Sequence, residues 1–287
     1  MRDMSKTVSP DSFQLKIRDY HVKVDNAVSA VLNMRRYSAY FAPLTQALKG
    51  GKRIRPVLLL LCFEAVGGQG ADPLPAAVAV ELAHTESLIH DDIIDEDVLR
   101  RKTPAFHAVH GYEMALLSAD FILSIILDIT ARFNNPGIAQ ALAQATSTMS
   151  EGELEEIRIH KNKQNITMNE YLRVISKKTA SLFEASATIG ATIGNGKKHE
   201  VEALAEYGRL LGTAYQIQDD ISDSEKASIN ISNFLAADPP RKISLQQALE
   251  LHILKAKQKL EKINQTEAKT LLINFADRVT SDQINTF

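Results

Sequence analysis

The sequence predicts an all-α protein, and three features point to this fold class. Apolar residues recur at spacings of three and four in most segments, whereas the alternation typical of half-buried strands is nearly absent. Clusters of glycine, proline and asparagine divide the chain into segments of helix length. No internal repeat or low-complexity linker marks a domain boundary, and long apolar helices need partners on several faces. We therefore expect a single large helical domain that spans residues 1–287.

The expected helices follow from the breaks between them, which fall at 50–51, 67–70, 134–137, 161–165 and 194–196. Pro56 lies soon after the first break, where the first turn of a helix tolerates a missing N–H. Two capping boxes, Thr167 with Glu170 and Ser244 with Gln247, predict further helix starts. The long segments 75–95 and 199–223 both end in carboxylates, and two closing helices follow a polar loop.

Composition and charge exclude several classes of protein. The 33 Lys and Arg residues nearly balance the 35 Asp and Glu residues, so no overall field would attract nucleic acid, and we expect no nucleic-acid partner. The longest apolar stretch, 114–131, contains Asp120 and Asp128, which disfavours a transmembrane segment. The N-terminus lacks the apolar core of a signal peptide, and the only cysteine, Cys62, excludes a disulfide framework. We expect a soluble, cytoplasmic protein.

The most specific motif is DDxxD, which ends both long segments. It consists of Asp91, Asp92 and Asp95 in the first segment and of Asp219, Asp220 and Asp223 in the second. Residues i and i+4 of a helix lie about 40° apart and i+1 about 100° away, so we expect the three carboxylates of each motif to face one region. Their repulsion is usually offset by cations, and oxygen ligands alone favour Mg²⁺ or Mn²⁺. Solvated acidic helix ends are the alternative, which is disfavoured because such acids oppose the helix dipole.

Basic residues occur in compact groups that would complement a bound diphosphate. They are Lys49, Lys52, Arg53 and Arg55; Arg100, Arg101 and Lys102; and Lys177 and Lys178. Arginine binds phosphate oxygens in a bidentate manner. Each group alone is more often a solvated surface. Together with the two acidic motifs, they predict one site that holds diphosphates.

Four runs in this order resemble the trans-isoprenyl diphosphate synthases, or polyprenyl synthetases, of the geranylgeranyl and farnesyl diphosphate synthase kind: GGKRIRP (50–56), ELAHTESLIHDDIIDEDVLRR (81–101), KTASLF (178–183) and YQIQDDISD (215–223). The resemblance implies antiparallel helices around a central cavity and a homodimer. It also implies head-to-tail condensation of isopentenyl diphosphate with dimethylallyl, geranyl or farnesyl diphosphate. About three Mg²⁺ ions per active site would assist.

The resemblance also assigns roles to individual residues. The family's metal ligands match Asp91, Asp92, Asp95 and Asp219, and Asp220 and Asp223 belong to the same motif as Asp219. Ligands of isopentenyl diphosphate match Lys52, Arg55, His84 and Arg101. The family residues that contact the allylic diphosphate match Arg100, Lys178 and Gln216. Those that stabilise a carbocation match Thr179 and Gln216. The departing diphosphate is the expected base.

The sequence departs from the family pattern in several places. After the second acidic motif the family carries two lysines; Lys242 is our candidate for the second, and the first has no clean match beyond Lys226. RRGxPTxH reads RRKTPAFH at 100–107, and the glutamine usual in EGQ is Glu153. Two alternatives stay open: a class I terpene cyclase and a non-catalytic regulatory subunit of a heteromeric synthase. A head-to-head synthase is disfavoured, because its DxxxD-like spacings differ from both motifs here.

Product length is expected from the turns before Asp91. In the resembled family, residues four, five and eight positions before this aspartate line the elongation cavity, and here they are Ser87, Glu86 and Ala83. None is aromatic, so we expect products of C20 or somewhat longer. Bulky residues on the following helix, Phe121, Ile122 and Ile125, are the candidates for a deeper floor.

Overall fold

The computed structural model describes residues 10–69, 71–100, 103–162, 166–223 and 239–280, and this part of the chain is almost entirely helical. The predicted fold class is therefore confirmed. The helices are α1 (Pro10–Asn33), α2 (Phe41–Ala47), α3 (Ile54–Ala65), α4 (Leu74–Ile94), α5 (Phe106–His110), α6 (Tyr112–Thr130), α7 (Pro136–Lys161), α8 (Met168–Ile175), the π-helix η1 (Ser176–Ala180), α9 (Ser181–Ile193), α10 (Lys198–Asp223), α12 (Pro239–Lys259), the 3-10 helix η2 (Leu260–Lys262) and α13 (Glu267–Val279). A small hairpin, β1 (Leu99–Arg100) with β2 (Thr103–Pro104), is antiparallel.

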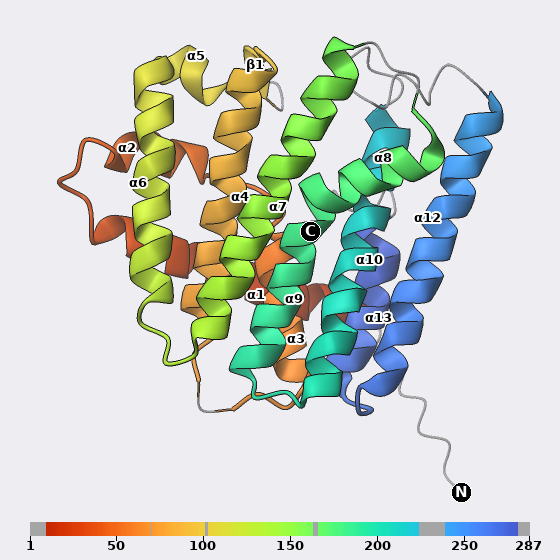
Figure 1. Ribbon diagram of the computed structural model, residues 1–287. Helices are drawn as coiled ribbons and strands as arrows, with labels where there is room; N and C mark the ends of the chain where they lie inside the picture. Colours follow the sequence, from red (N-terminus) through yellow and green to blue (C-terminus); the bar gives the residue numbers. More distant parts are fainter. Residues whose placement is uncertain (1–9, 70, 101–102, 163–165, 224–238, 281–287) are drawn as a thin grey trace, which may run out of the picture.

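The long helices lie side by side and run up and down the molecule (Figure 1). Helix α10 packs most extensively on α9 and α12, and α4 packs on α6. Helices α4 and α10 run in the same direction, so their C-terminal ends lie at the same end of the bundle, at the top of Figure 1. The fold therefore brings the two DDxxD motifs to one end of the molecule.

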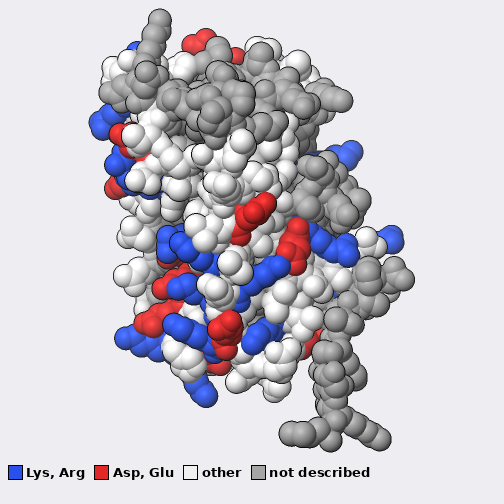
Figure 2. Space-filling view, turned by 90° about the vertical axis from the view of Figure 1, so that its right-hand side faces the viewer, with Lys and Arg blue, Asp and Glu red and all other residues white. Residues whose placement is uncertain are grey.

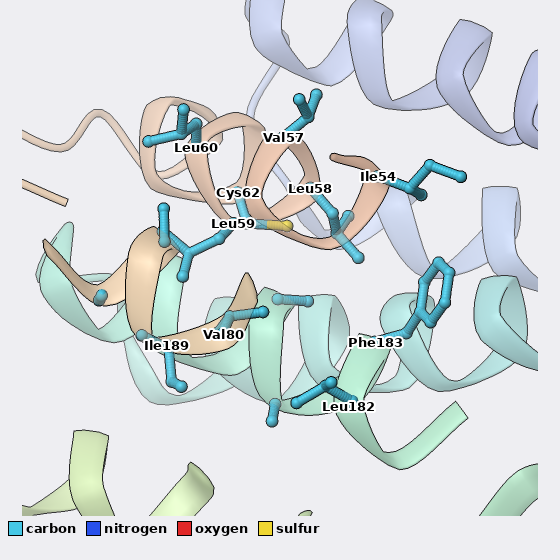
Figure 3. Packing of buried hydrophobic residues seen from close by; sticks show 14 of the residues in the cluster. Ile54, Val57, Leu58, Leu59, Leu60, Cys62, Val80, Leu182, Phe183 and Ile189 are labelled. Atoms are coloured by element: carbon cyan, nitrogen blue, oxygen red, sulfur yellow. The ribbon is translucent and has the colours of Figure 1, made fainter. Parts of the chain in front are cut away.

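Helix α3 lies at the centre of the core, because it is apolar on nearly every side. All of its residues except Arg55 and Glu64 are buried, and it packs against α9 and α4 (Figure 3). Where α3 crosses α9, a Cβ atom on Gly190 would lie 2.1 Å from the carbonyl oxygen of Leu59, so this approach requires glycine. Cys62 is fully buried in the same contact, and burial raises the pKa of its thiol.

One of the two predicted capping boxes is confirmed. The Thr167 hydroxyl accepts a hydrogen bond from the backbone N–H of Glu170, and the Glu170 carboxylate accepts one from the N–H of Thr167, at the start of α8. The box predicted at Ser244 is wrong, because α12 begins at Pro239 and Ser244 lies inside it. Proline favours the first turn of a helix, and the pair Pro239-Pro240 therefore starts α12 earlier than the capping pattern predicted.

Charges of both signs are mixed on the described surface of the side formed by α12 (Figure 2). Figure 2 shows Lys and Arg residues interspersed with Asp and Glu residues over the lower half of this side. Ion pairs such as Lys259 with Glu206 and Lys257 with Asp277 join α12 to α10 and α13. Among the helices in the described part of the chain, none is long and apolar enough to cross a membrane.

Candidate functional site

Two pockets flank the C-terminal half of α4. The first, which we call the α3–α4 pocket, has a volume of about 180 Å³ and lies between the loop before α3, helix α4 and helix α5. The second, the α4–α7 pocket, has a volume of about 340 Å³ and lies between α4, α7 and η1. One face of α4, including His84 and Asp92, lines the first pocket, and another face, including Glu86 and Asp91, lines the second.

The α3–α4 pocket gathers basic residues from three parts of the chain. Lys52 and Arg55 come from the loop and first turn of α3, His84 from α4, and Arg100 from the hairpin strand β1. The guanidinium of Arg55 lies 4.7 Å from the ring centroid of Phe183, a cation–π contact that restricts its orientation. This pocket has the chemistry of an anion site.

The loop before α3 is held in place by Arg53. This residue has a left-handed backbone, with φ of 44°, and its side chain is only 5% exposed. Its guanidinium donates to Glu81 of α4 at 2.5 Å, to Asp25 of α1 at 2.9 Å and to the carbonyl oxygen of Leu48. Because these three partners fix the side chain between α1, α2 and α4, the loop carries Lys52 and Arg55 at a defined position in the pocket.

The first DDxxD motif divides between the two pockets. Asp91 is half-buried and lines the α4–α7 pocket, and burial raises the pKa of its carboxyl to about 7. Asp92 is 3% exposed, lines the α3–α4 pocket and accepts a hydrogen bond from Arg100 at 2.6 Å. The expectation that all three carboxylates face one region is therefore wrong for Asp92, since a rotation of about 100° per residue turns it to another face. Asp95, one turn beyond Asp91, is exposed.

Lys178 lies among carboxylates at the edge of the α4–α7 pocket. It forms ion pairs with Glu153 at 2.6 Å and Glu156 at 2.7 Å, both on α7. Burial alone would lower the pKa of Lys178, but the carboxylates of Glu156, Asp91 and Glu153 outweigh it and raise the pKa. Burial raises the pKa of Asp95, and the charge of Lys178 acts in the opposite direction, so Asp95 is a fourth acid that interacts with this one cation.

The π-helix η1 positions Lys178, and Gly152 of α7 makes room for it. A Cβ atom on Gly152 would lie 2.6 Å from the backbone nitrogen of Lys178 and 2.8 Å from the Cβ of Lys177. Single π-helical turns inside α-helices are frequent at functional sites. Here the turn joins α8 to α9 and carries both Lys178 and Thr179, of which Thr179 is buried.

The second DDxxD motif carries a hydrogen-bonded network. Asp219 is exposed, whereas Asp220 accepts hydrogen bonds from the hydroxyl of Tyr171 at 2.5 Å and from Nε2 of Gln216 at 2.9 Å. The hydroxyl of Thr179 donates to Oε1 of Gln216 at 2.8 Å. Burial raises the pKa of Asp220 to about 7, although the two hydrogen bonds to its carboxylate act in the opposite direction.

Comparison with known proteins places the chain in a family. Residues 38–270 match the family model described as polyprenyl synthetase. The chain belongs to the polyprenyl synthetase family. Two similar proteins are both from Methanosarcina mazei. The geranylgeranyl diphosphate synthase is 38% identical over 73% of this chain, and the match spans 66% of that relative, just under two thirds of its length. The geranylfarnesyl diphosphate synthase is 33% identical over 82% of this chain and 83% of its own length.

Solved structures agree with this polyprenyl synthetase assignment. The geranylgeranyl pyrophosphate synthetase from Pyrococcus horikoshii superimposes with a TM-score of 0.81. It is 27% identical, and the superposition covers 94% of this chain and 98% of that protein. The predicted family is therefore confirmed by sequence and by fold.

Several predicted site residues of this polyprenyl synthetase come together, and others lie elsewhere. Lys52, Arg55 and His84 share the α3–α4 pocket, as the resemblance implied. Arg100, expected with the allylic diphosphate, lines that same pocket and not the α4–α7 pocket, because its ion pair with Asp92 holds it there. Arg101 and Lys226, and the side chains of Asp223 and Lys242, lie outside the described residues.

The wall of the α4–α7 pocket comes from α4 and α7. Glu86, Ser87 and Ala83 do line it, but its other wall comes from α7, through Thr146, Met149, Leu154 and Ile157. Phe121 is instead stacked on Tyr40 with centroids 4.5 Å apart, and Ile122 and Ile125 are buried in the core. None of these three residues is among those that line this pocket, and their role as a floor deeper in the protein stays a prediction.

Sequence reasoning missed the partners that hold the site together. Tyr171 and Glu156 lie on α8 and α7, far in sequence from the carboxylates and cations that they contact. The only available signal for Glu156 was the acidic run EGELEE, which differs from the expected glutamine at Glu153. Tyr171 had no signal beyond its place in an apolar stripe.

Proposed function

We propose that this polyprenyl synthetase condenses isopentenyl diphosphate head-to-tail with an allylic diphosphate and releases diphosphate. The observation that carries this proposal is the arrangement around α4: a basic pocket on one face and a pocket lined by Asp91 and Lys178 on another. Two neighbouring diphosphate sites are what a two-substrate transfer needs. The names of the similar proteins, geranylgeranyl and geranylfarnesyl diphosphate synthase, support the same reaction.

Isopentenyl diphosphate binds in the α3–α4 pocket in this proposal. Lys52 and Arg55 would bind its phosphate oxygens, and His84 on α4 would supply a further donor. Arg53 keeps the loop rigid through its bonds to Glu81 and Asp25, so less conformational freedom is lost on binding.

The allylic diphosphate lies at the mouth of the α4–α7 pocket, and its prenyl chain lies inside. Lys178 would leave its carboxylate partners and neutralise charge on the departing diphosphate. The apolar wall from Met149, Leu154 and Ile157 excludes water from the allylic cation. Thr179 and Gln216 present oxygen atoms that stabilise its positive charge, and the departing diphosphate takes up the proton that is lost at the end.

The donor chemistry of the site fits Mg²⁺. Asp91, Asp95, Glu153 and Glu156 surround a single Lys178, and this excess of carboxylates would be offset by divalent cations. Among the described residues no group of three acids or histidines is arranged to hold a metal ion. Mg²⁺ takes one or two protein carboxylates and fills its shell with water and phosphate. Asp91 and Asp95 on α4 would hold Mg²⁺ from one side and Asp219 on α10 would hold a separate ion from the other, and these ions would stabilise the negative charge of the leaving group.

Product length, oligomeric state and location complete the proposal. The side chains of Glu86, Ser87 and Ala83 leave the α4–α7 pocket without an aromatic barrier at that level, which supports products of C20 or longer.

An exposed apolar stripe on α6, formed by Tyr112, Leu116, Leu123 and Leu127, supports a homodimer. We also propose that residues 1–287 form one domain and act in the cytoplasm.

Turnover of the purified chain tests the proposed function. The full chain is incubated with Mg²⁺, isopentenyl diphosphate and either dimethylallyl, geranyl or farnesyl diphosphate, and the products are separated by chromatography after removal of diphosphate. Formation of all-trans prenyl diphosphates of C20 or more supports the proposal. Cyclic hydrocarbons from the allylic substrate alone, or no reaction with any primer, would contradict it.

A further inference from the structure

The carboxylate of Asp220 is engaged on both of its oxygen atoms. The hydroxyl of Tyr171 donates to Oδ2 at 2.5 Å, and Nε2 of Gln216 donates to Oδ1 at 2.9 Å. Gln216 lies one turn before Asp220 on α10, and Tyr171 is a fully buried residue of α8. Two helices therefore fix this carboxylate from two directions.

This arrangement decides which way the amide of Gln216 points. A glutamine amide has a donor end and an acceptor end, and a carboxylate oxygen can only accept from it. With Nε2 directed at Asp220, Oε1 is directed the other way, where the hydroxyl of Thr179 donates to it at 2.8 Å. The bonds thus form one continuous series from Tyr171 through Asp220 and Gln216 to Thr179.

The series ends at two residues whose neighbours in the sequence line the two pockets. Thr179 directly follows Lys178, which lines the α4–α7 pocket, and Gln216 directly follows Tyr215, which lines the α3–α4 pocket. A carbonyl oxygen and a hydroxyl oxygen stabilise a nearby positive charge, whereas an amide NH₂ group in the same place would oppose it.

We propose that Tyr171 is a positioning residue for the condensation: through Asp220 it holds the amide of Gln216 so that Oε1, and with it Oγ1 of Thr179, faces the allylic carbon as positive charge develops there. This inference rests on the proposed function. It also assigns Asp220 to positioning, because both oxygens are already engaged, and leaves the exposed Asp219 as the metal ligand of the second motif.

The test replaces only the hydroxyl group, and the chain offers a matched control. Tyr171→Phe keeps the buried ring. Tyr207→Phe removes the hydroxyl of another fully buried tyrosine, which donates to the carbonyl oxygen of Leu272 at 2.7 Å, away from both pockets. We expect Tyr171→Phe to lower kcat by about tenfold or more, with both Michaelis constants and the Mg²⁺ concentration for half-maximal rate within about twofold of the parent. Tyr207→Phe should leave kcat within about twofold of the parent.

Two further comparisons locate the effect. In a Gln216→Ala background, Tyr171→Phe should lower kcat by less than about twofold, because the amide through which Tyr171 acts on the reacting carbon is already absent. Asp220→Asn keeps an acceptor for Gln216 and offers a donor to the Tyr171 oxygen, so its kcat should stay within about fivefold of the parent. In Asp220→Ala, kcat should fall at least as far as it does in Tyr171→Phe. If Tyr171→Phe does not fold, the two Asp220 variants decide the question.

The outcomes separate this inference from the proposed function. A parent enzyme that makes no prenyl diphosphate overturns both. An active parent with equal kcat losses in Tyr171→Phe and Tyr207→Phe overturns the positioning role alone. A rise of about tenfold in the Mg²⁺ requirement of Tyr171→Phe or Asp220→Asn also overturns it, because Asp220 would then be a metal ligand.

Discussion

Arg53 is an unusual residue in the described part of the chain, since it combines a left-handed backbone with a nearly complete loss of solvent contact. A non-glycine residue in this region is uncommon and costs energy, which the surrounding bonds must offset. The ion pair with buried Glu81 and the bond to the Leu48 carbonyl oxygen supply this compensation. Burial lowers the pKa of Arg53, but Glu81 and Asp25 outweigh it and raise the pKa. Arg53 therefore remains charged and acts as the anchor of the loop.

At the same scale, Asp91 is the residue on which turnover should depend most. Asp91→Ala should lower turnover by about 10²-fold or more, because a ligand that stabilises the leaving group is lost. The unfolding free energy of the metal-free protein should stay equal or rise slightly, since burial already disfavours the ionised carboxylate and raises its pKa. Steady-state kinetics and thermal unfolding measure the two effects. The exposed Asp97, just beyond the motif, provides the control as Asp97→Ala, and near-normal turnover in Asp91→Ala would contradict the assignment.

Arg55 should act mainly on one substrate. Arg55→Ala should raise the Michaelis constant for isopentenyl diphosphate by about tenfold or more, because charge-assisted hydrogen bonds contribute about 1.5–3 kcal/mol. The Michaelis constant for the allylic primer should change little, since Arg55 lies in the α3–α4 pocket. Initial-rate measurements with each substrate varied in turn separate the two constants. The exposed Arg36 serves as the control in Arg36→Ala, and equal changes for both substrates would refute the division between the pockets.

At the scale of elements, sequence periodicity located the helices well and the faces of α4 poorly. The segments predicted at 75–95 and 199–223 correspond to α4 and α10 within one residue at each end, because apolar spacing and chain breaks are local properties. Which wall each face of α4 meets depends on how α3 and α7 pack, and no local pattern contains that information. The sequence therefore did not predict that Asp92 and Arg100 line the α3–α4 pocket while Asp91 lines the α4–α7 pocket.

The close contact between α7 and η1 predicts the effect of adding one methyl group at Gly152. Gly152→Ala would place a Cβ atom 2.6 Å from the backbone nitrogen of Lys178, so η1 must move. We expect a loss of about 1–3 kcal/mol of stability from overpacking and a fall of about tenfold in kcat from the displacement of Lys178 and Thr179. Chemical denaturation and kinetics measure these effects. Gln144→Ala, at an exposed position of the same helix, should change neither, and a fully active Gly152→Ala would show that η1 does not position the site.

The wall of α4 gives a prediction for product length. Glu86→Phe should shorten the main product, because an aromatic ring would then enter the α4–α7 pocket at the level of Ala83 and Ser87. Glu86→Ala should give an equal or longer product. Burial, with a contribution from Asp120, raises the pKa of Glu86 to about 7, so Glu86→Gln, which keeps the volume, is the control for charge. Chromatography of the products measures the change, and an unchanged product in Glu86→Phe would mean that this side chain does not meet the growing chain.

At the scale of the whole molecule, the C-terminal ends of α4 and α10, which carry the two DDxxD motifs, lie at one end of the bundle (Figure 1). The exposed apolar stripe lies on α6. Helix α6 packs against α4, which forms the wall shared by both pockets. A second copy seated on the stripe would therefore support α4 from outside. Exposed leucines at regular helical spacing are costly in water, and dimerisation would remove this cost.

This arrangement predicts that one charge on α6 disrupts the proposed dimer. Leu116→Glu should yield monomers in sedimentation experiments, because an ionised carboxylate would be buried in an apolar interface without a partner. Leu251→Glu offers a matched control, because Leu251 is also an exposed leucine, 46% exposed, but lies on α12 outside the stripe. A Leu116→Glu protein that remains dimeric would place the interface elsewhere.

The burial of Cys62 gives the molecule a single chemical marker of its integrity. Its thiol lies inside the contact of α3 with its neighbours (Figure 3), and its raised pKa leaves almost no thiolate to react. An alkylating reagent can reach it only in molecules whose central helices have separated. Every alkylated chain in a preparation would therefore record a past opening of the core, even after that molecule had refolded.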